Sequence, residues 1–177
     1  MKGESIMRET KFCKESYVVK TSIVQPPDTN SHGTLFGGKL MAYIDDIAGI
    51  AAMRHARKAV VTASTDSVDF LHPIYEGNAV CLEAFVTYTG RSSMEVFVKV
   101  IAEGLLTGER NVCALSFLTM VAVDEEGKPI EIPAVVPVTD EEKSLYESAK
   151  DRAQIRKKRR KDSEERAKSF GSELPWN

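Results

Sequence analysis

A loop of small and polar residues, NSHGTLFGG, runs from Asn30 to Gly38 and ends on two adjacent glycines. The residues that follow have helical spacing, so Gly37 and Gly38 should lie at a helix entrance. Backbone N–H groups at a helix start lack partners within the helix, and glycine leaves them open to close approach. Together with the helix dipole, two such donors could hold a carbonyl oxygen as it gains negative charge. The alternative is a tight loop that only lets the helix pack.

Asp45 is the second unusual residue, because it falls inside the same helical pattern beside Ile44 and close to Ile47. A carboxylate next to this apolar stripe should need polar partners, since burying an unpaired charge is costly. In an apolar groove it could activate water as a general base, or attack a carbonyl carbon as a nucleophile. Asp45 could also simply satisfy a neighbouring backbone group. Asp46, one position further round, is expected to be an ordinary solvated acid.

The helix that carries Asp45 is predicted over KLMAYIDDIAGIAAMRHARK, residues 39–58. Its buried stripe should consist of apolar residues that recur at helical spacing, namely Leu40, Ile44, Ile47, Ala48 and Ala51. A strand of alternating character precedes the loop and is stopped by Pro26-Pro27. Four runs rich in β-branched and aromatic residues follow the helix, separated by short turns, which predicts an antiparallel meander. A single helix wrapped by a long antiparallel sheet is one of the few layouts that this order permits.

Beyond Asp124 three prolines predict an extended linker, and a polar helix should begin after a cap at Thr139. We therefore divide the chain into an N-terminal extension (1–15), a main domain (16–135) and a C-terminal helix with a tail (136–177).

The C-terminal helix includes a basic run from Arg152 to Lys161 that has seven Lys and Arg and no acid. A charge run of this kind is usually a solvated helix face or a frayed end, and we expect this for most of it. Alternatively, its cations could bind phosphate groups. Arg156 and Arg159, closest to the body of the domain, are the candidates for that role.

Size, charge and composition exclude several classes of protein. A chain of 177 residues suits one domain, and a net charge of −2 gives no reason to expect nucleic acid as a partner. The first 15 residues are broken by charges and do not resemble a signal peptide, and no apolar run is long enough to span a membrane. Three cysteines are best explained as reduced thiols of a cytoplasmic protein.

The segment NSHGTLFGGKLMAYIDDIAG closely resembles the active-site segment of the hotdog-fold acyl-CoA thioesterases, the bacterial and mammalian cytosolic acyl-CoA hydrolase group. The likeness continues through VTASTDSVDFLHPIYEGNAV and the turn TGRSS to the strand ending at Val123. It covers roughly residues 16–135, and the order of these motifs is highly specific. The resemblance implies an α+β hotdog fold, in which a long antiparallel sheet wraps around one central helix, here with an added C-terminal helix.

The resemblance also implies roles for matching residues. Asp45 matches the catalytic carboxylate, Asn30 an asparagine that positions the water or the carbonyl, and Gly37 the glycine whose N–H polarises that carbonyl. Gly38 and His32, in the same loop, are expected to contact the substrate. The turn matches a segment that contacts coenzyme A, through Arg91, Ser92 and Ser93.

The same resemblance implies no metal and no cofactor apart from the coenzyme A of the substrate. The residues agree with this, because His32, His55 and His72 are scattered and lack an accompanying cysteine or acid cluster.

The distance between Gly37 and Asp45 predicts a site shared between two subunits. Eight residues correspond to about 12 Å along a helix axis, whereas both groups must reach one carbonyl carbon. One helix cannot easily achieve this, but a two-fold-related copy can. We therefore expect a homo-oligomer, at least a dimer, with Asn30 and Gly37 from one subunit and Asp45 from the other. A trimer of dimers, a hexamer, would follow family habit.

The function expected is hydrolysis of acyl-CoA to a carboxylic acid and free coenzyme A, within fatty acid metabolism. The alternative is a non-catalytic acyl-CoA-binding sensor, because the same fold also serves as a ligand-binding module. A sensor would need a fused recognition domain or loss of the carboxylate, and Asp45 is present. A dehydratase would pair a histidine with a carboxylate, and only His32 is placed to try; the loop from Asn30 to Gly37 fits hydrolysis better.

Overall fold

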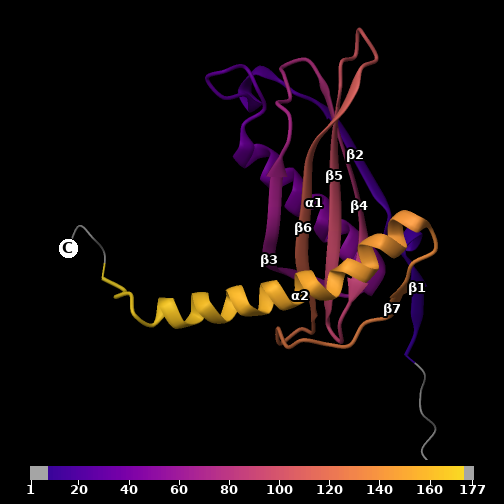
Figure 1. Cartoon of the computed structure of the whole chain (residues 1–177), viewed down its shortest axis with the longest axis vertical. Coiled ribbons are helices and arrows are strands. Elements are labelled where there is room, and N and C mark those ends of the chain that lie inside the picture. Colours follow the sequence, from indigo (N-terminus) through magenta and orange to yellow (C-terminus); the bar gives the residue numbers. More distant parts are fainter. Residues whose placement is uncertain (1–7, 174–177) are drawn as a thin grey trace, which may run out of the picture.

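A long antiparallel sheet lies around the helix α1 (Gly37–Ala56), which Figure 1 shows behind the strands. The computed structural model describes residues 8–173 of the chain. Five strands have the spatial order β2-β4-β5-β6-β3, and each neighbouring pair is antiparallel. Their bounds are β2 Val18–Ile23, β3 Ala59–Phe70, β4 Ala79–Thr89, β5 Ser93–Glu103 and β6 Arg110–Val123. The predicted α+β arrangement, with one helix against a long antiparallel sheet, is confirmed.

The apolar stripe of α1 holds the helix against the sheet. All five residues predicted for this stripe are buried, namely Leu40, Ile44, Ile47, Ala48 and Ala51. On β5, alternate residues are fully buried as well: Met94, Val96, Val98 and Val100. Burying one such aliphatic side chain contributes about 1.5–3 kcal/mol before entropy is counted. Burial is one-sided, however, because Met41 on the other face of α1 is 47% exposed.

The prediction of a four-strand meander is correct for β4, β5 and β6 and wrong for β3. β3 pairs with β6, whereas β4 lies between β2 and β5. The connection of residues 71–78 therefore carries the chain from one edge of the sheet toward the other. Eight residues can span up to about 26 Å, and three strand spacings need only about 14 Å. A short connection thus did not require the two strands to be neighbours.

A small second sheet joins the start of the described chain to the segment before α2. β1 (Thr10–Phe12) pairs in parallel with β7 (Ala134–Val136), and the single-turn 3-10 helix η1 (Cys13–Ser16) follows β1. A second single turn, η2 (Pro26–Asp28), follows β2 and confirms that the prolines end that strand. The segment expected as an extension thus pairs with the end of the predicted main domain and with Val136, the first residue of the predicted C-terminal segment. Residues 1–7 and 174–177 lie outside the described part.

The helix α2 (Asp140–Ala167) crosses the face of the sheet opposite α1, which we call the outer face, and its C-terminal half extends beyond the sheet (Figure 1). The predicted cap is confirmed: the Thr139 side chain accepts a hydrogen bond from the Glu142 N–H, and the Glu142 carboxylate accepts from the Thr139 N–H. Within residues 8–173, neither α1 nor α2 combines the length and apolar character that crossing a membrane requires.

A histidine is fully buried where the last turn of α1 meets the small sheet. His55 has no exposed surface, and its Nε2 lies 2.9 Å from the Pro133 carbonyl oxygen. Its Nδ1 has no hydrogen-bond partner among the described residues. Burial, together with the nearby cation of Lys11, lowers the pKa of His55 despite its bond to Pro133. The imidazole is therefore neutral in the folded protein.

This burial predicts a loss of stability in mild acid. The unfolded state should bind a proton near pH 6.5 while the folded state resists it, so the free energy of unfolding should fall as pH drops below 6.5, by up to about 1.4 kcal/mol per pH unit. His55→Gln, which keeps a side-chain donor but does not titrate, should have a flatter profile in thermal melts between pH 6.5 and 5. The exposed His72→Gln is the matched control. Equal slopes for wild type and His55→Gln would contradict the expectation.

Candidate active site

The entrance of α1 presents two backbone N–H groups that have no acceptor among residues 8–173. Phe36, the residue before the helix, is extended and provides no side-chain cap. Its carbonyl accepts from the N–H groups of Lys39 at 2.9 Å and Leu40 at 3.1 Å. The N–H groups of Gly37 and Gly38 therefore remain open at the positive end of the helix dipole, where an electron-rich atom binds favourably.

The two glycines differ in what surrounds them. A Cβ atom on Gly38 would lie 2.5 Å from Cε1 of Phe36, whose ring occupies that space. A Cβ atom on Gly37 would meet only the ring of Phe70, at an ordinary 3.7 Å. Packing within one chain therefore does not require glycine at position 37. Close approach of a ligand to its N–H would require it.

The loop before the helix is closed by Asn30. Its Oδ1 accepts from the His32 backbone N–H at 2.9 Å, and its Nδ2 donates to Thr34 Oγ1 at 2.9 Å. The Asn30 N–H also donates to the Thr34 carbonyl at 2.8 Å. The exposed His32 side chain has no hydrogen bond within the described range.

A pocket of about 360 Å³ opens beside the helix entrance and contains both Asn30 and Gly37 in its wall. The rest of the wall is mainly apolar and includes Leu35, Leu40, Phe70, Leu71 and Ile74. A few polar groups in an apolar wall are typical of a small-molecule site. The sequence-predicted Asn30 and Gly37 are therefore brought together, and we call this hollow the loop pocket.

Asp45 does not line the loop pocket. Its Oδ1 accepts a hydrogen bond of 2.7 Å from Thr62 Oγ1 on β3, and its side chain is exposed in the single chain. Asp45 therefore has the polar partner that we expected, but Ile44 and Ile47 turn toward the sheet while the Asp45 side chain turns away from it. Asp46 is exposed, as expected, and pairs with Lys20.

Thr62 is a candidate site residue that the sequence did not indicate. It lies in a strand rich in Ser and Thr, where no pattern singles out one hydroxyl. Only the packing of β3 beside α1 shows that this hydroxyl reaches the carboxylate of Asp45. By donating to Oδ1, Thr62 orients the acid and leaves Oδ2 available to another group.

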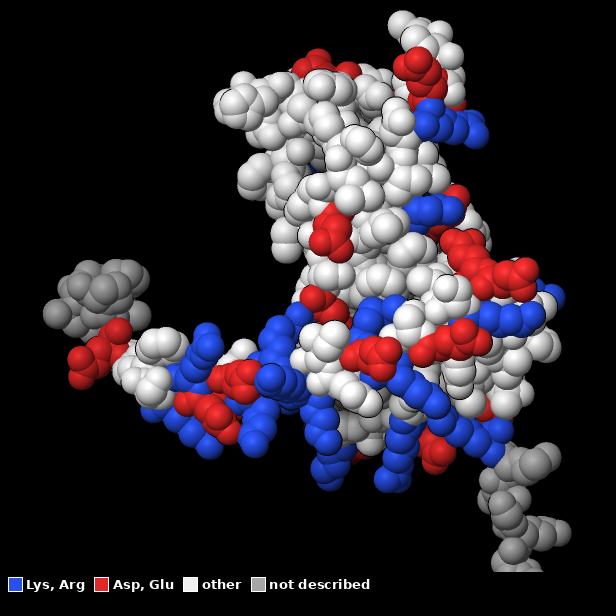
Figure 2. Space-filling model, viewed as in Figure 1, with Lys and Arg blue, Asp and Glu red and all other residues white. Residues whose placement is uncertain are grey.

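A second pocket, of about 690 Å³, lies between α2 and the outer face of the sheet. Of the residues predicted to contact coenzyme A, Ser93, Arg156 and Arg159 line it together. Lys157 and Arg160 add two further cations, and we call this hollow the basic pocket. Figure 2 shows the Lys and Arg side chains concentrated along α2, with fewer over the strands above it.

The other two turn residues are not in the basic pocket. Arg91 is exposed and its carbonyl accepts from the Ile132 N–H at 3.1 Å, while the Ser92 carbonyl accepts from the Ala122 N–H at 2.9 Å. The turn is thereby fixed at one end of the sheet. The contact of Arg91 and Ser92 with coenzyme A stays a prediction.

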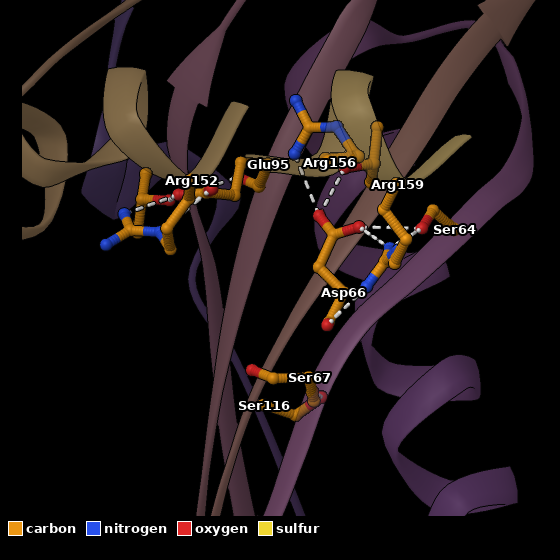
Figure 3. Close-up of polar contacts among 10 residues, drawn as sticks. Ser64, Asp66, Ser67, Glu95, Ser116, Arg152, Arg156 and Arg159 are labelled. Atoms are coloured by element: carbon orange, nitrogen blue, oxygen red, sulfur yellow. Dashed lines mark hydrogen bonds and ion pairs between the residues drawn. The ribbon is translucent and has the colours of Figure 1, made fainter. Parts of the chain in front are cut away.

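Most of the basic run is solvated, as predicted, but three of its arginines bind acids of the sheet. Arg152 pairs with Glu95, and both Arg156 and Arg159 pair with Asp66 (Figure 3). The sequence did not reveal these acids, because Glu95 and Asp66 lie within strand patterns far from the helix along the chain. Burial by itself would raise the pKa of Asp66, but hydrogen bonds from Ser64, Thr119 and Arg156 hold it below its usual range.

Comparison with known proteins identifies the family of the chain. Residues 32–109 match the model of the thioesterase superfamily. The uncharacterized acyl-CoA thioester hydrolase YkhA of Bacillus subtilis is 61% identical over 168 residues, which cover 95% of this chain and 98% of YkhA. The chain belongs to the acyl-CoA thioesterases of this superfamily. The cytosolic acyl coenzyme A thioester hydrolase of Rattus norvegicus is 37% identical over 80% of the chain, which spans only 38% of the rat protein.

Solved structures place this thioesterase among hexameric and coenzyme A-bound relatives. A hexameric acyl-CoA thioesterase superimposes with a TM-score of 0.84 at 57% identity, covering 85% of this chain and 97% of the other. The acyl-CoA hydrolase of Staphylococcus aureus, in complex with butyryl coenzyme A and coenzyme A, has a TM-score of 0.87 at 48% identity, covering 90% and 98%.

The Staphylococcus aureus enzyme has also been solved with an asparagine, an aspartate or a threonine replaced by alanine. In that chain the asparagine precedes the aspartate by fifteen residues and the threonine follows it by seventeen. Asn30, Asp45 and Thr62 of the present thioesterase have the same two spacings.

Proposed function

We propose that this thioesterase hydrolyses acyl-CoA to a carboxylic acid and free coenzyme A. The observation that carries the proposal is the hydrogen bond between Thr62 and Asp45, which orients an exposed carboxylate on a helix whose entrance has free N–H donors. The names of the relatives, all acyl-CoA hydrolases at 37–61% identity, support the same reaction class.

In the proposed reaction Asp45 removes a proton from water as the oxygen attacks the thioester carbonyl carbon. The N–H of Gly37 stabilises the negative charge on the carbonyl oxygen, a contribution typically worth about 2.7–4 kcal/mol. The carbon–sulfur bond then breaks, and the proton held by Asp45 passes to the departing thiolate. Direct attack by Asp45 to form an anhydride, followed by hydrolysis, uses the same groups. Neither route needs a metal or a bound cofactor.

The proposed site is shared between two copies of the chain. Asp45 and the loop pocket face different regions of one chain, so one copy would supply Asn30 and Gly37 and another would supply Asp45. Large apolar side chains around these groups are uncovered in the single chain: Phe36 is 56%, Met41 47%, Val61 49% and Phe70 55% exposed. Clustered exposed apolar groups favour burial against a partner. The hexameric relatives support an assembly of this kind, and we propose a trimer of dimers.

The basic pocket is the proposed site for the phosphates of coenzyme A. Arg156 and Arg159 share one carboxylate, Asp66, so the pair keeps a net positive charge beside Ser93. Lys157 and Arg160 raise the local positive potential further. Guanidinium groups suit phosphate because they donate two parallel hydrogen bonds.

Thiol release from a panel of acyl-CoA thioesters tests the proposed activity. Asp45→Asn should lower kcat about 10²- to 10⁴-fold, because an amide cannot accept the proton. Thr62→Val should lower kcat by roughly ten- to a hundredfold, through loss of a hydrogen bond to a charged group. Binding of coenzyme A without thiol release by the wild type would overturn the proposal in favour of a sensor.

Mixed oligomers test whether the site is shared. Homo-oligomers of Asp45→Ala and of Asn30→Ala should each be nearly inactive, because each lacks one half of every site. After subunit exchange, mixed dimers should recover up to about half of the activity per dimer, since one of their two sites is intact. Heterodimers demonstrated by mass spectrometry that show no recovery would exclude a shared site.

Substrates with and without phosphates test the basic pocket. Lys157→Gln should raise KM for acyl-CoA about two- to fivefold, as expected for one partly exposed cation. It should leave KM unchanged for the matching acyl-N-acetylcysteamine thioester, which has no phosphate. Lys150→Gln, on the same helix but outside the pocket, is the matched control. An equal rise of KM for both substrates would remove the pocket from the proposal.

A further inference from the structure

Two clamps of arginine and carboxylate fasten α2 to the outer face of the sheet (Figure 3). The arginines are spaced four and three residues apart, at 152, 156 and 159, so they project from one side of the helix. Their partners lie on different strands, Glu95 on β5 and Asp66 on β3. The two clamps look alike, but they hold very different parts of the sheet.

The clamp at Glu95 holds an interior strand. Arg152 Nε lies 3.0 Å from Glu95 Oε2 and Nη2 lies 2.7 Å from Oε1, and the Glu95 side chain is 1% exposed. The guanidinium of Arg152 also stacks on the ring of Phe117, 4.1 Å from its centroid. The register between β4 and β5 shifts beside Glu95, but β5 has a strand neighbour on each side and pairs without interruption with β6 there, so its position does not depend on the clamp.

The clamp at Asp66 holds an irregular edge strand. Arg156 Nη1 lies 2.8 Å from Oδ2, Arg159 Nη2 lies 2.8 Å from Oδ1, and Arg159 Nη1 donates to the Asp66 carbonyl at 2.7 Å. The hydroxyl groups of Ser64 and Thr119 also donate hydrogen bonds to the Asp66 carboxylate, at 2.6 Å and 2.8 Å. Five hydrogen bonds therefore converge on one residue whose side chain is 9% exposed.

The pairing of β3 is broken on both sides of this clamp. The register between β3 and β6 shifts between Thr62 and Ser64, and again between Thr65 and Ser67. Bulges of this kind bend a strand and re-aim its side chains. In the described chain β3 has a strand neighbour on one side only, so β6 alone cannot fix the path of residues 62–67. The contacts to Asp66 supply the missing constraint.

We infer that Asp66, held by Arg156 and Arg159, is a positioning residue that sets the path of bulged β3 and thereby the place of the Thr62 hydroxyl against Asp45. This inference rests on the proposed function, in which Thr62 orients the reacting carboxylate. A buried ion pair adds little net stability, but it fixes one geometry, because both partners must meet within hydrogen-bond distance. A displacement of about 1 Å in a catalytic group can cost roughly a hundredfold in rate.

Asp66→Asn and Glu95→Gln form a matched pair of variants. Each removes the charge of one buried carboxylate that faces arginines of α2, and each keeps the shape of the side chain. Both should lower the midpoint of thermal unfolding. Only Asp66→Asn should lower kcat, by roughly ten- to a hundredfold. Its KM for acyl-CoA should not rise, because Arg156 and Arg159 remain and lose a competing anion. Glu95→Gln should keep the wild-type kcat.

A double-mutant cycle with Thr62→Val tests whether the effect of Asp66→Asn on kcat is transmitted through Thr62. If Asp66 acts through Thr62, then Asp66→Asn should cause little further loss of kcat in the Thr62→Val background. Ser64→Ala, a milder change in the same clamp, serves if Asp66→Asn does not assemble, and it should lower kcat several-fold with the same non-additivity. Arg159→Lys offers a further check of the clamp at Asp66. It keeps the positive charge of the side chain but removes the guanidinium fork that contacts both Ser64 and Asp66.

The outcomes separate this inference from the proposed function. If Thr62→Val slows hydrolysis while Asp66→Asn and Ser64→Ala keep the wild-type kcat, the positioning role is overturned and the hydrolytic mechanism stands. Equal loss of kcat in Asp66→Asn and Glu95→Gln would also overturn it, since a general loosening of α2 would then explain both. If Thr62→Val itself has no effect, the role proposed for Thr62 fails first.

Discussion

The constraint on which this structure depends is that α1 can bury only one of its faces against the sheet. Leu40, Ile44 and Ile47 fill the inner surface and fix the helix in place. The same packing turns Asp45 outward, where Thr62 from β3 meets it. The helix therefore serves as both the core element and the carrier of the candidate acid. Because its entrance at Gly37 faces a different pocket, the shared site that we propose places another chain against the outward face.

Much of the fold could be predicted because its signals are local. Helical spacing identified α1 and its buried stripe, a proline pair ended β2, and a threonine three residues before a glutamate capped α2. The strands followed from β-branched and aromatic runs. The neighbour of β3 could not be predicted in this way, because the length of a connection limits how far the chain can travel and not which strand it joins. Pairing of β3 with β6 is a non-local choice, made by the whole sheet.

The residues of the candidate site also fall into two groups, those that the sequence indicated and those that only contacts in the structure reveal. Gly37 and Asp45 were found in the sequence because a glycine pair at a helix start and an acid beside an apolar stripe are unusual on their own, whereas Asn30 was implied only by the family resemblance. Thr62 and Asp66 are ordinary residues in a strand rich in hydroxyl groups, and only their contacts in the structure indicate their roles. The outward direction of Asp45 was also hidden, since periodicity shows which residues face the core and not how the neighbouring position is solvated.

The placement of β3 has a consequence for how the chain acquires its structure. β3 (Ala59–Phe70) finds its only strand neighbour among the described residues in β6 (Arg110–Val123), so the hairpins of β4, β5 and β6 must be synthesised before β3 can dock. Contacts so far apart in sequence form slowly, because a long loop must close first. During translation α1 and β3 therefore lack the strand β6 for a time and expose apolar surface. Intermediates of this kind aggregate or recruit chaperones. The strand that carries Thr62 can thus take its place beside Asp45 only after β6 has been synthesised.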